Sequence, residues 1–279
     1  MASAPPVRPV ITSRNWLEEA KQKRKVRPTA AIIYGGPGIG KTSMAAFAPS
    51  PIFLSDYSED GVGILAATGL IPEVSQMPPL EKWRDVIDQL KALETGEHEF
   101  KTLVVDTLGG VETLMHQYTI NQDFGGDKGE KGFAGYGRGA KVATSYVRDL
   151  LNAIDRVRDT KGMSVLILAH AKIATRKNPD GPDYDRWVPV CEPPTWEVFE
   201  RWADMVLFCD YVTVVAGTSD PMKKGNARGG EDRVIRTTNA ATFVAKNRLN
   251  LPTEISMGGN GQEAWSNLLE AIKTGRQAN

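Results

Sequence analysis

The chain has 279 residues, of which 41% are hydrophobic and 24% charged, and its formal net charge is zero. This composition is typical of a globular protein with a sizeable core, and any nucleic-acid site must be a local patch because the chain as a whole is not basic. No apolar run is long enough to span a membrane and no signal-peptide pattern is present, so we expect a cytoplasmic protein. Cys191 and Cys209 match no metal-ligand spacing and are predicted to be reduced thiols.

The first 27 residues are predicted to form an N-terminal arm and a short basic helix. Residues 1–14 are rich in proline and small residues, which favours a loosely held arm. Residues 16–27 could form a basic helix, either a solvated helix leading into the first strand, which we favour, or a nucleic-acid-binding patch. The rest of the chain shows no repeat and no clean linker, so residues 28–279 are predicted to form one domain.

Residues 30–48 combine an apolar strand, a glycine-rich loop and a stretch that can be helical. The segment GGPGIGKT fits the pattern G-x-x-x-x-G-K-[ST] of a phosphate-binding loop and follows a continuous apolar run, as in a buried parallel strand. Its glycines allow backbone N–H groups to surround a phosphate, while Lys41 would reach the β- and γ-phosphates and Thr42 would bind Mg²⁺. The predicted nucleotide-binding residues are Gly35, Gly36, Pro37, Gly38, Ile39, Gly40, Lys41, Thr42 and Ser43.

Three further buried strands and several helices follow this loop. The apolar runs at 51–55, 102–106 and 165–170 predict strands, and the first is followed by an acidic cluster, Asp56, Glu59 and Asp60. Apolar residues at helical spacing predict an amphipathic helix over 80–94 and further helices around 111–118 and 142–157. The sequence therefore predicts an α/β fold with a mainly parallel central sheet flanked by helices.

Two stretches break the helix and strand patterns. Residues 123–141 contain seven glycines between Gly125 and Gly139, which predicts a long mobile loop of the kind that is usually functional. Residues 171–195 are a second irregular stretch with many basic and aromatic side chains. The remaining predictions are a short helix at 196–202, one or two strands at 204–216, a hairpin or disordered loop at 217–233, late antiparallel strands at 234–238 and 242–245, and an amphipathic helix at 262–274.

Polar residues at the strand ends suggest the chemistry. Phosphate-loop ATPases use an aspartate from a neighbouring strand on the Mg²⁺ side and a carboxylate that orients the attacking water. Asp106 fits the first role, although it could instead cap the following helix. For the second role Glu59 is our choice, with Asp56 as its competitor. His170 ends a buried strand where ligands bind in such folds, and it is either a group that senses the γ-phosphate or a structural histidine.

Eight motifs, taken in order, resemble those of a known family: GGPGIGKT, SEDG, LVVDT, GYGRGAK, GMSVLILAHAK, PDYDRW, WADMVLF and AKNRLNLP. That family comprises phage ATP-binding proteins of the RecA-like type, single-strand annealing recombinases that resemble a reduced RecA/RadA core. The resemblance covers about residues 28–257. It implies a RecA-like P-loop NTPase fold for the core, 28–279, and a protein located in the cytoplasm of a bacterial host.

The resemblance also implies roles for individual residues. Glu59 would take the place of the catalytic glutamate and His170 that of the sensor that couples the γ-phosphate to a DNA-binding loop. The stretches 123–139 and 171–195 would occupy the places of the two DNA-facing loops. Lys246 and Arg248 resemble an element that reaches the ATP of a neighbouring subunit. The chain departs from the family in two ways: the family acid usually lies closer to its strand, and no separate N-terminal DNA-binding domain is evident.

We therefore expect an ATP- and Mg²⁺-dependent ATPase that binds single-stranded DNA and promotes annealing or strand exchange. It would act as a homo-oligomeric ring or filament, with a single-strand-binding protein as a further partner, and would not bind membranes. One alternative is a small-molecule phosphotransferase, although Arg176 and Arg186 are too dispersed for an arginine-rich lid. The other is a nucleotide-controlled scaffold or helicase-loading accessory protein that hydrolyses little ATP and ignores DNA.

Overall fold

The computed structural model describes residues 26–56, 61–216 and 226–277, and every structural statement below refers to these residues. The predicted N-terminal arm, almost all of the predicted basic helix, and both Glu59 and Asp60 lie outside them. No helix in the described ranges is long and apolar enough to cross a membrane.

A ten-stranded sheet in the order β10-β8-β7-β1-β5-β4-β2-β3, with β6 and β9 paired to β5 and β7, forms the centre of the described chain. The strands from β7 to β3 in this order are parallel, whereas β6, β8, β9 and β10 pair with their neighbours in antiparallel fashion. This arrangement confirms the predicted mainly parallel sheet with late antiparallel strands. The strands are β1 (Ala30–Gly35), β2 (Pro51–Ser55), β3 (Ser75–Gln76), β4 (Thr102–Asp106), β5 (Ser164–Arg176), β6 (Tyr184–Pro189), β7 (Met205–Ala216), β8 (Asn226–Arg236), β9 (Lys246–Asn247) and β10 (Glu254–Ser256).

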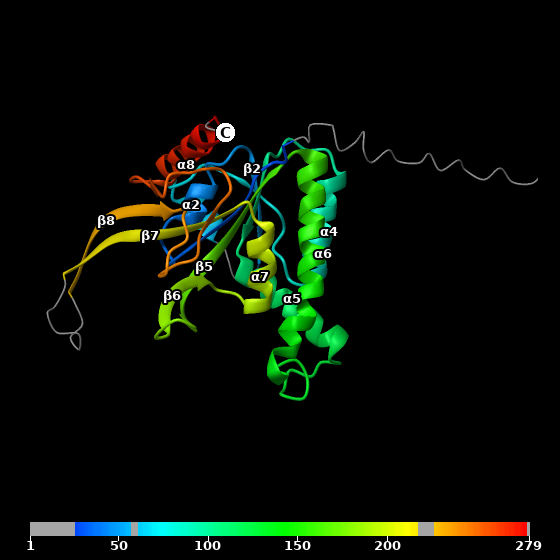
Figure 1. Ribbon diagram of the computed structural model, residues 1–279. Helices are drawn as coiled ribbons and strands as arrows, with labels where there is room; N and C mark the ends of the chain where they lie inside the picture. The colour runs from blue at the N-terminus through cyan, green and yellow to red at the C-terminus, as the bar shows by residue number, and fades with distance from the viewer. Residues whose placement is uncertain (1–25, 57–60, 217–225, 278–279) are drawn as a thin grey trace, which may run out of the picture.

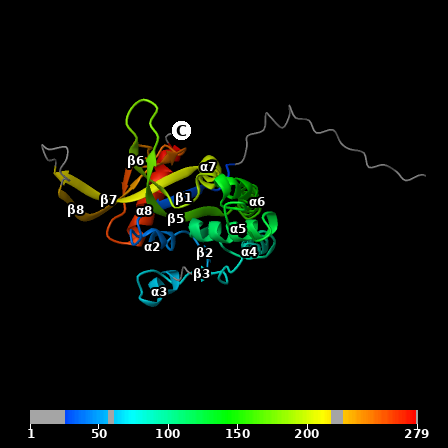
Figure 2. The ribbon, with the colours of Figure 1, turned by 90° about the horizontal axis from the view of Figure 1, so that it is seen from below.

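Helices cover both faces of the sheet, so the parallel strands are buried on both sides (Figures 1 and 2). Along β1, Ala30, Ile32 and Tyr34 join a core with α4, α5, α6 and α7, while Ala31 and Ile33 join a second core with α2, α3 and α8. This alternation is the period of a strand, and it explains why β1 is apolar at every position. The helices are α2 (Lys41–Ala45), α3 (Gly61–Ala67), α4 (Trp83–Thr95), α5 (Leu108–Asp123), α6 (Arg138–Lys161), α7 (Pro193–Trp202) and α8 (Gly261–Gln277), with a short 3₁₀ helix, η1 (Gly135–Gly137).

The glycine-rich stretch is shorter and more ordered than predicted. α5 continues to Asp123 and α6 begins at Arg138, so the connection spans residues 124–137 rather than 123–141. Successive turns close it through backbone hydrogen bonds, including Phe133 N–H to the Asp127 carbonyl at 3.0 Å. The ring of Phe133 packs against the rings of His116 and Phe124. Glycine content predicted a loop here, but it could not reveal the aromatic contacts that hold its turns.

The stretch 171–195 is largely regular, contrary to the prediction of an irregular loop. β5 runs on to Arg176 and pairs with β6 in an antiparallel hairpin that projects from the sheet (Figures 1 and 2). Its turn is closed by the Lys177–Asp183 ion pair at 2.6 Å. Trp187, one of the aromatic residues of this stretch, packs on Phe208 with ring centroids 6.1 Å apart. Charged residues along both strands, including the buried Arg186, concealed the strand period.

The late strands also differ from the prediction in one place. Of the stretch predicted as a hairpin or disordered loop, residues 217–225 lie outside the described ranges, and the rest belongs to β8, which pairs with β7 in antiparallel fashion. Residues 242–245 form no strand: Phe243 makes only an isolated bridge to Trp187, and the antiparallel pairing comes from β9 and β10. Tyr34 explains this geometry, because its hydroxyl donates to the Val244 carbonyl at 2.6 Å and accepts from the Val244 N–H at 2.9 Å. The segment is thus tied to β1 by a side chain.

We expect Tyr34→Phe to lower the free energy of unfolding by about 1–3 kcal/mol, because it leaves buried polar groups of Val244 without their hydroxyl partner. Urea unfolding measures this change. Tyr136→Phe is the matched control, since the Tyr136 ring is fully exposed and its variant should unfold like the unaltered protein. An unchanged midpoint for Tyr34→Phe would show that the hydroxyl does not hold the segment.

Candidate functional site

The strands β1, β2 and β4 end side by side at the carboxyl edge of the sheet, next to the point where β5 leaves it. The strands stand in the order β1, β5, β4, β2. Their register pairs Gly35 of β1 with His170 of β5, and Asp106 of β4 with Ser55 of β2. Side chains alternate along a strand, so the side of each terminal residue follows from the residue two positions earlier. Those earlier residues all belong to the core on the α2 side: Ile33, Leu168, Val104 and Phe53. The terminal positions therefore also face α2 and the loop that precedes it.

The phosphate loop, Gly35 to Thr42, connects β1 to α2 and depends on glycine at specific positions. Gly38 and Gly40 have φ of 73° and 103°, in the left-handed region that favours glycine. Gly35 needs its small size for another reason: a Cβ there would lie 2.4 Å from the Cys209 carbonyl of β7. At Gly36 and Gly38 a Cβ would meet nothing within 4 Å, so the loop leaves open space beside its backbone. This open, glycine-rich curve fits a phosphate group.

Lys41 is buried, and its ammonium group lies against the start of the phosphate loop. It donates to the carbonyls of Gly35 and Gly36 at 3.1 and 3.0 Å. These contacts hold the cation against the start of the loop.

Thr42 and Asp106 come together as predicted for a magnesium site. The Thr42 hydroxyl donates to a carboxylate oxygen of Asp106 at 2.8 Å, and Asp106 is only 5% exposed. Beside them, the buried hydroxyl of Ser55 has no hydrogen-bond partner among the described residues. Hydroxyl and carboxylate oxygens are the ligands that Mg²⁺ accepts together with nucleotide phosphates, so this set fits the ion. Thr107, not Asp106, is the N-cap of α5, which excludes the alternative cap role of Asp106.

The competing carboxylate, Asp56, lies on the other side of the sheet. Its side chain packs against Gly110 in the first turn of α5, so closely that a Cβ on Gly110 would overlap its carboxylate. Leu54, two residues earlier, belongs to the α5 side as well. Asp56 is therefore not on the face that carries Thr42 and Asp106, whereas Glu59 lies outside the described residues.

His170 marks the point where β5 changes its neighbour. Up to Leu168 the strand pairs with β4, and from Ala171 onward it pairs with β6. The His170 carbonyl itself accepts from the Val190 N–H at 2.8 Å, just past the end of β6. A displacement of β5 at this residue would thus reach both the phosphate loop, through Gly35, and the projecting hairpin.

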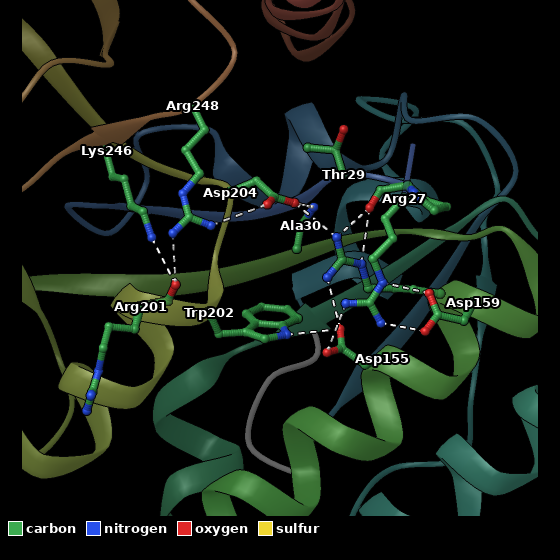
Figure 3. A network of polar contacts seen from close by, with 12 residues as sticks. Arg27, Thr29, Ala30, Asp155, Asp159, Arg201, Trp202, Asp204, Lys246 and Arg248 are labelled. Atoms are coloured by element: carbon green, nitrogen blue, oxygen red, sulfur yellow. Dashed lines mark hydrogen bonds and ion pairs between the residues drawn. The ribbon is translucent and has the colours of Figure 1, made fainter. Parts of the chain in front are cut away.

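Lys246 and Arg248 lie away from the phosphate loop of their own chain, at the amino edge of the parallel strands, where Lys246 pairs with Val206 near the start of β7 (Figure 3). Lys246 donates to the carbonyls of Glu200 and Arg201 at the end of α7, and Arg248 contacts the Arg201 carbonyl at 3.4 Å and the Asp204 carboxylate at 3.7 Å. Burial, together with nearby Arg248, lowers the pKa of Lys246. The structure does not bring these two residues to the site formed by Thr42 and Asp106.

Asp204, whose carboxylate contacts Arg248, belongs to a larger polar network at the amino edge of the parallel strands (Figure 3). Asp204 also accepts from the Ala30 N–H at 3.0 Å and from the buried Arg158 at 2.9 Å. Arg158 in turn donates to Asp155 at 2.9 Å, and Asp155 accepts from the indole of Trp202 at 3.0 Å. The start of β1 and the end of α7 are therefore fixed by one hydrogen-bonded cluster, to which Arg248 is attached.

Arg233 contacts the phosphate loop, although sequence reasoning did not select it. Its guanidinium group, from β8, donates to the Ile39 carbonyl at 3.3 Å and to the Gly258 carbonyl at 3.0 Å. The residue lies in a stretch rich in glycine and charge, 194 positions from its partner in the loop. No local pattern could have identified this pairing, because it depends on the sheet order.

Comparison with known proteins shows a family and a structural similarity. Residues 27–249 match the AAA domain model. No curated protein matches the chain at a significant level. Among solved structures, the chain is similar to the crystal structure of the RadB recombinase, with 13% sequence identity and a TM-score of 0.45, over 85% of this chain and 90% of that chain.

Both cysteines are expected to be unreactive in the native protein. Burial raises the pKa of Cys209 from 9.0 to about 12, although nearby Lys41 and Arg233 oppose the rise, and burial also raises the pKa of Cys191. A thiol reagent at pH 8 should label neither cysteine until guanidinium is added, when it should label both. The stabilisation from keeping Cys209 protonated is present below pH 9 and is lost as the pH rises toward 12. Labelling of Cys209 in the native protein would contradict the packing of β7 under Gly35.

Proposed function

Because the chain belongs to the AAA domain family of P-loop ATPases, we propose that it is an ATP-dependent recombination or annealing protein that binds single-stranded DNA. The observation that carries this proposal is the position of His170. It lies where β5 leaves the nucleotide edge of the sheet and enters the projecting β5–β6 hairpin. β5 thus connects the neighbourhood of the phosphate loop to the hairpin. DNA bound at the hairpin could therefore affect the nucleotide site through this strand.

In this proposal the carboxyl edge binds ATP and Mg²⁺. The phosphate loop surrounds the phosphates, Lys41 stabilises their negative charge, and Thr42 and Asp106 hold the ion. The magnesium ion would bridge phosphate oxygens and neutralise the charge that develops during phosphoryl transfer. Glu59 is our candidate for the group that orients the attacking water, since Asp56 faces α5.

DNA would lie along the connection 124–137 and the β5–β6 hairpin. Both carry exposed basic side chains that can contact phosphates, among them Lys128, Lys131, Lys172, Arg176 and Lys177. Tyr136 is fully exposed between two glycines, and Tyr184 is half-buried on the hairpin. Exposed rings of this kind can stack on unpaired bases without sequence preference.

Lys246 and Arg248 would act on the ATP of an adjacent subunit in a ring or filament. Phosphoryl-transfer transition states gain strongly from a cation supplied in trans. Their position near the start of β7, far from their own loop, is compatible with an interface between successive subunits. A single-strand-binding protein remains a proposed partner that would deliver DNA, given that the chain carries no net charge.

The first test is steady-state ATP hydrolysis with and without single-stranded DNA. We expect DNA to stimulate the rate and Lys41→Ala to abolish it, because the lysine stabilises the transferred phosphate. Duplex DNA of the same sequence serves as the control. Hydrolysis that does not respond to single-stranded DNA would contradict the proposal and favour a nucleotide-controlled scaffold.

The second test is Arg248→Ala, which should still bind ATP but lose DNA-stimulated hydrolysis by at least about tenfold, a modest estimate for a cation supplied in trans. Arg84→Ala is the matched control, because the Arg84 side chain is 79% exposed on α4, apart from α7 and the phosphate loop. Mixing Arg248→Ala with Lys41→Ala subunits should restore part of the activity, since each supplies what the other lacks. Failure of this complementation would contradict action between subunits.

A further inference from the structure

Arg233 is held on the phosphate loop by contacts that involve both its side chain and its backbone. Its guanidinium group donates to the Ile39 and Gly258 carbonyls. Its own carbonyl accepts from the Met257 N–H at 2.9 Å. The residue therefore joins three segments that are distant in sequence: the phosphate loop, β8, and the connection from β10 to α8.

The local strand geometry places Arg233 at an irregularity of the hairpin. Arg233 pairs with Tyr211, and the β7–β8 register shifts immediately afterwards, between Tyr211 and Thr213. Bulges and irregularities of this kind redirect side chains next to functional sites. Here the guanidinium reaches the loop so closely that a Cβ on Gly40 would lie 2.9 Å from one of its nitrogens.

These contacts lie on the outer side of the phosphate loop. Gly258 and Gly261 belong to the segment that packs behind α2, where a Cβ on Gly261 would lie 2.4 Å from the Ser43 carbonyl. Lys41, by contrast, donates to the Gly35 and Gly36 carbonyls on the inside of the curve. Arg233 therefore holds the loop at Ile39, on the side of Gly258, whereas Lys41 holds its start at Gly35 and Gly36.

The orientation of one peptide unit follows from this arrangement. In a trans peptide the C=O of Ile39 and the N–H of Gly40 point in opposite directions. Because Arg233 holds the Ile39 carbonyl on the outer side, the Gly40 N–H is directed toward the inner side, where the proposed phosphate would lie. The left-handed φ of Gly40 is part of the same local geometry.

We propose that Arg233 is a positioning residue for ATP binding, which orients the Gly40 N–H toward a phosphate by fixing the Ile39 carbonyl. The inference rests on the proposed binding of ATP by the phosphate loop. It does not require the guanidinium to touch the nucleotide. A lysine at 233 would keep the charge but could not donate to two carbonyls in a fixed fork, so charge and positioning can be separated.

The experiment measures binding of a fluorescent ATP analogue with Mg²⁺, without DNA, to the full chain and its variants. We expect Arg233→Gln and Arg233→Lys to weaken binding by about 10- to 100-fold, by analogy with groups that orient metal ligands without touching the metal. Arg236→Gln is the matched control: Arg236 lies on the same strand but pairs with Asp210 and Glu254, and its variant should bind like the unaltered protein. Thermal unfolding without nucleotide verifies that all variants are folded.

Kinetics add a readout that a purely structural role would not move. Loss of a ground-state contact should raise KM for ATP and leave kcat unchanged, whereas partial unfolding would lower the apparent kcat. Wild-type affinity in Arg233→Gln, or full rescue by Arg233→Lys, would overturn the positioning role. If the unaltered chain binds no ATP, the inference falls with the proposed function. If the chain binds ATP but ignores DNA, only the proposed DNA function falls.

Discussion

The register of the parallel strands is the constraint on which the rest of the site depends. It sets Gly35 beside His170 and Ser55 beside Asp106, all on the face of the sheet that carries α2. Because the strands are buried on both faces, a shift by one residue would turn every core side chain to the wrong side. The Thr42–Asp106 hydrogen bond is a consequence, since β1 and β4 both neighbour β5 and end at the same edge.

The carboxyl and amino edges of the sheet differ in structure. At the carboxyl edge the loop is open on its inner side and supported from outside by Arg233 and the segment before α8. At the amino edge a buried arginine and two aspartates fix β1, α6 and α7 to one another. In the proposed assembly the nucleotide edge of one subunit would meet the amino edge of the next, which presents Arg248.

Local patterns predicted the strands, the phosphate loop and the approach of Thr42 to Asp106, because each depends on short-range periodicity or on a motif. They failed where the outcome depends on distant packing. Charged residues along the β5–β6 hairpin concealed a strand, and Trp187 packs partly buried against Phe208. Arg233 was missed because the sheet order, not the local sequence, brings β8 to the phosphate loop.

The measurement that tests the central claim most directly is calorimetric titration of the chain with ATP, with and without Mg²⁺, repeated for Asp106→Asn. The account predicts one ATP per chain, bound more tightly with Mg²⁺. It also predicts that Asp106→Asn still binds ATP but loses most of this Mg²⁺ dependence, because a neutral amide replaces the carboxylate that would bind the ion together with Thr42. No ATP binding, or equal Mg²⁺ dependence in both proteins, would contradict the assignment of the carboxyl edge as the nucleotide and magnesium site.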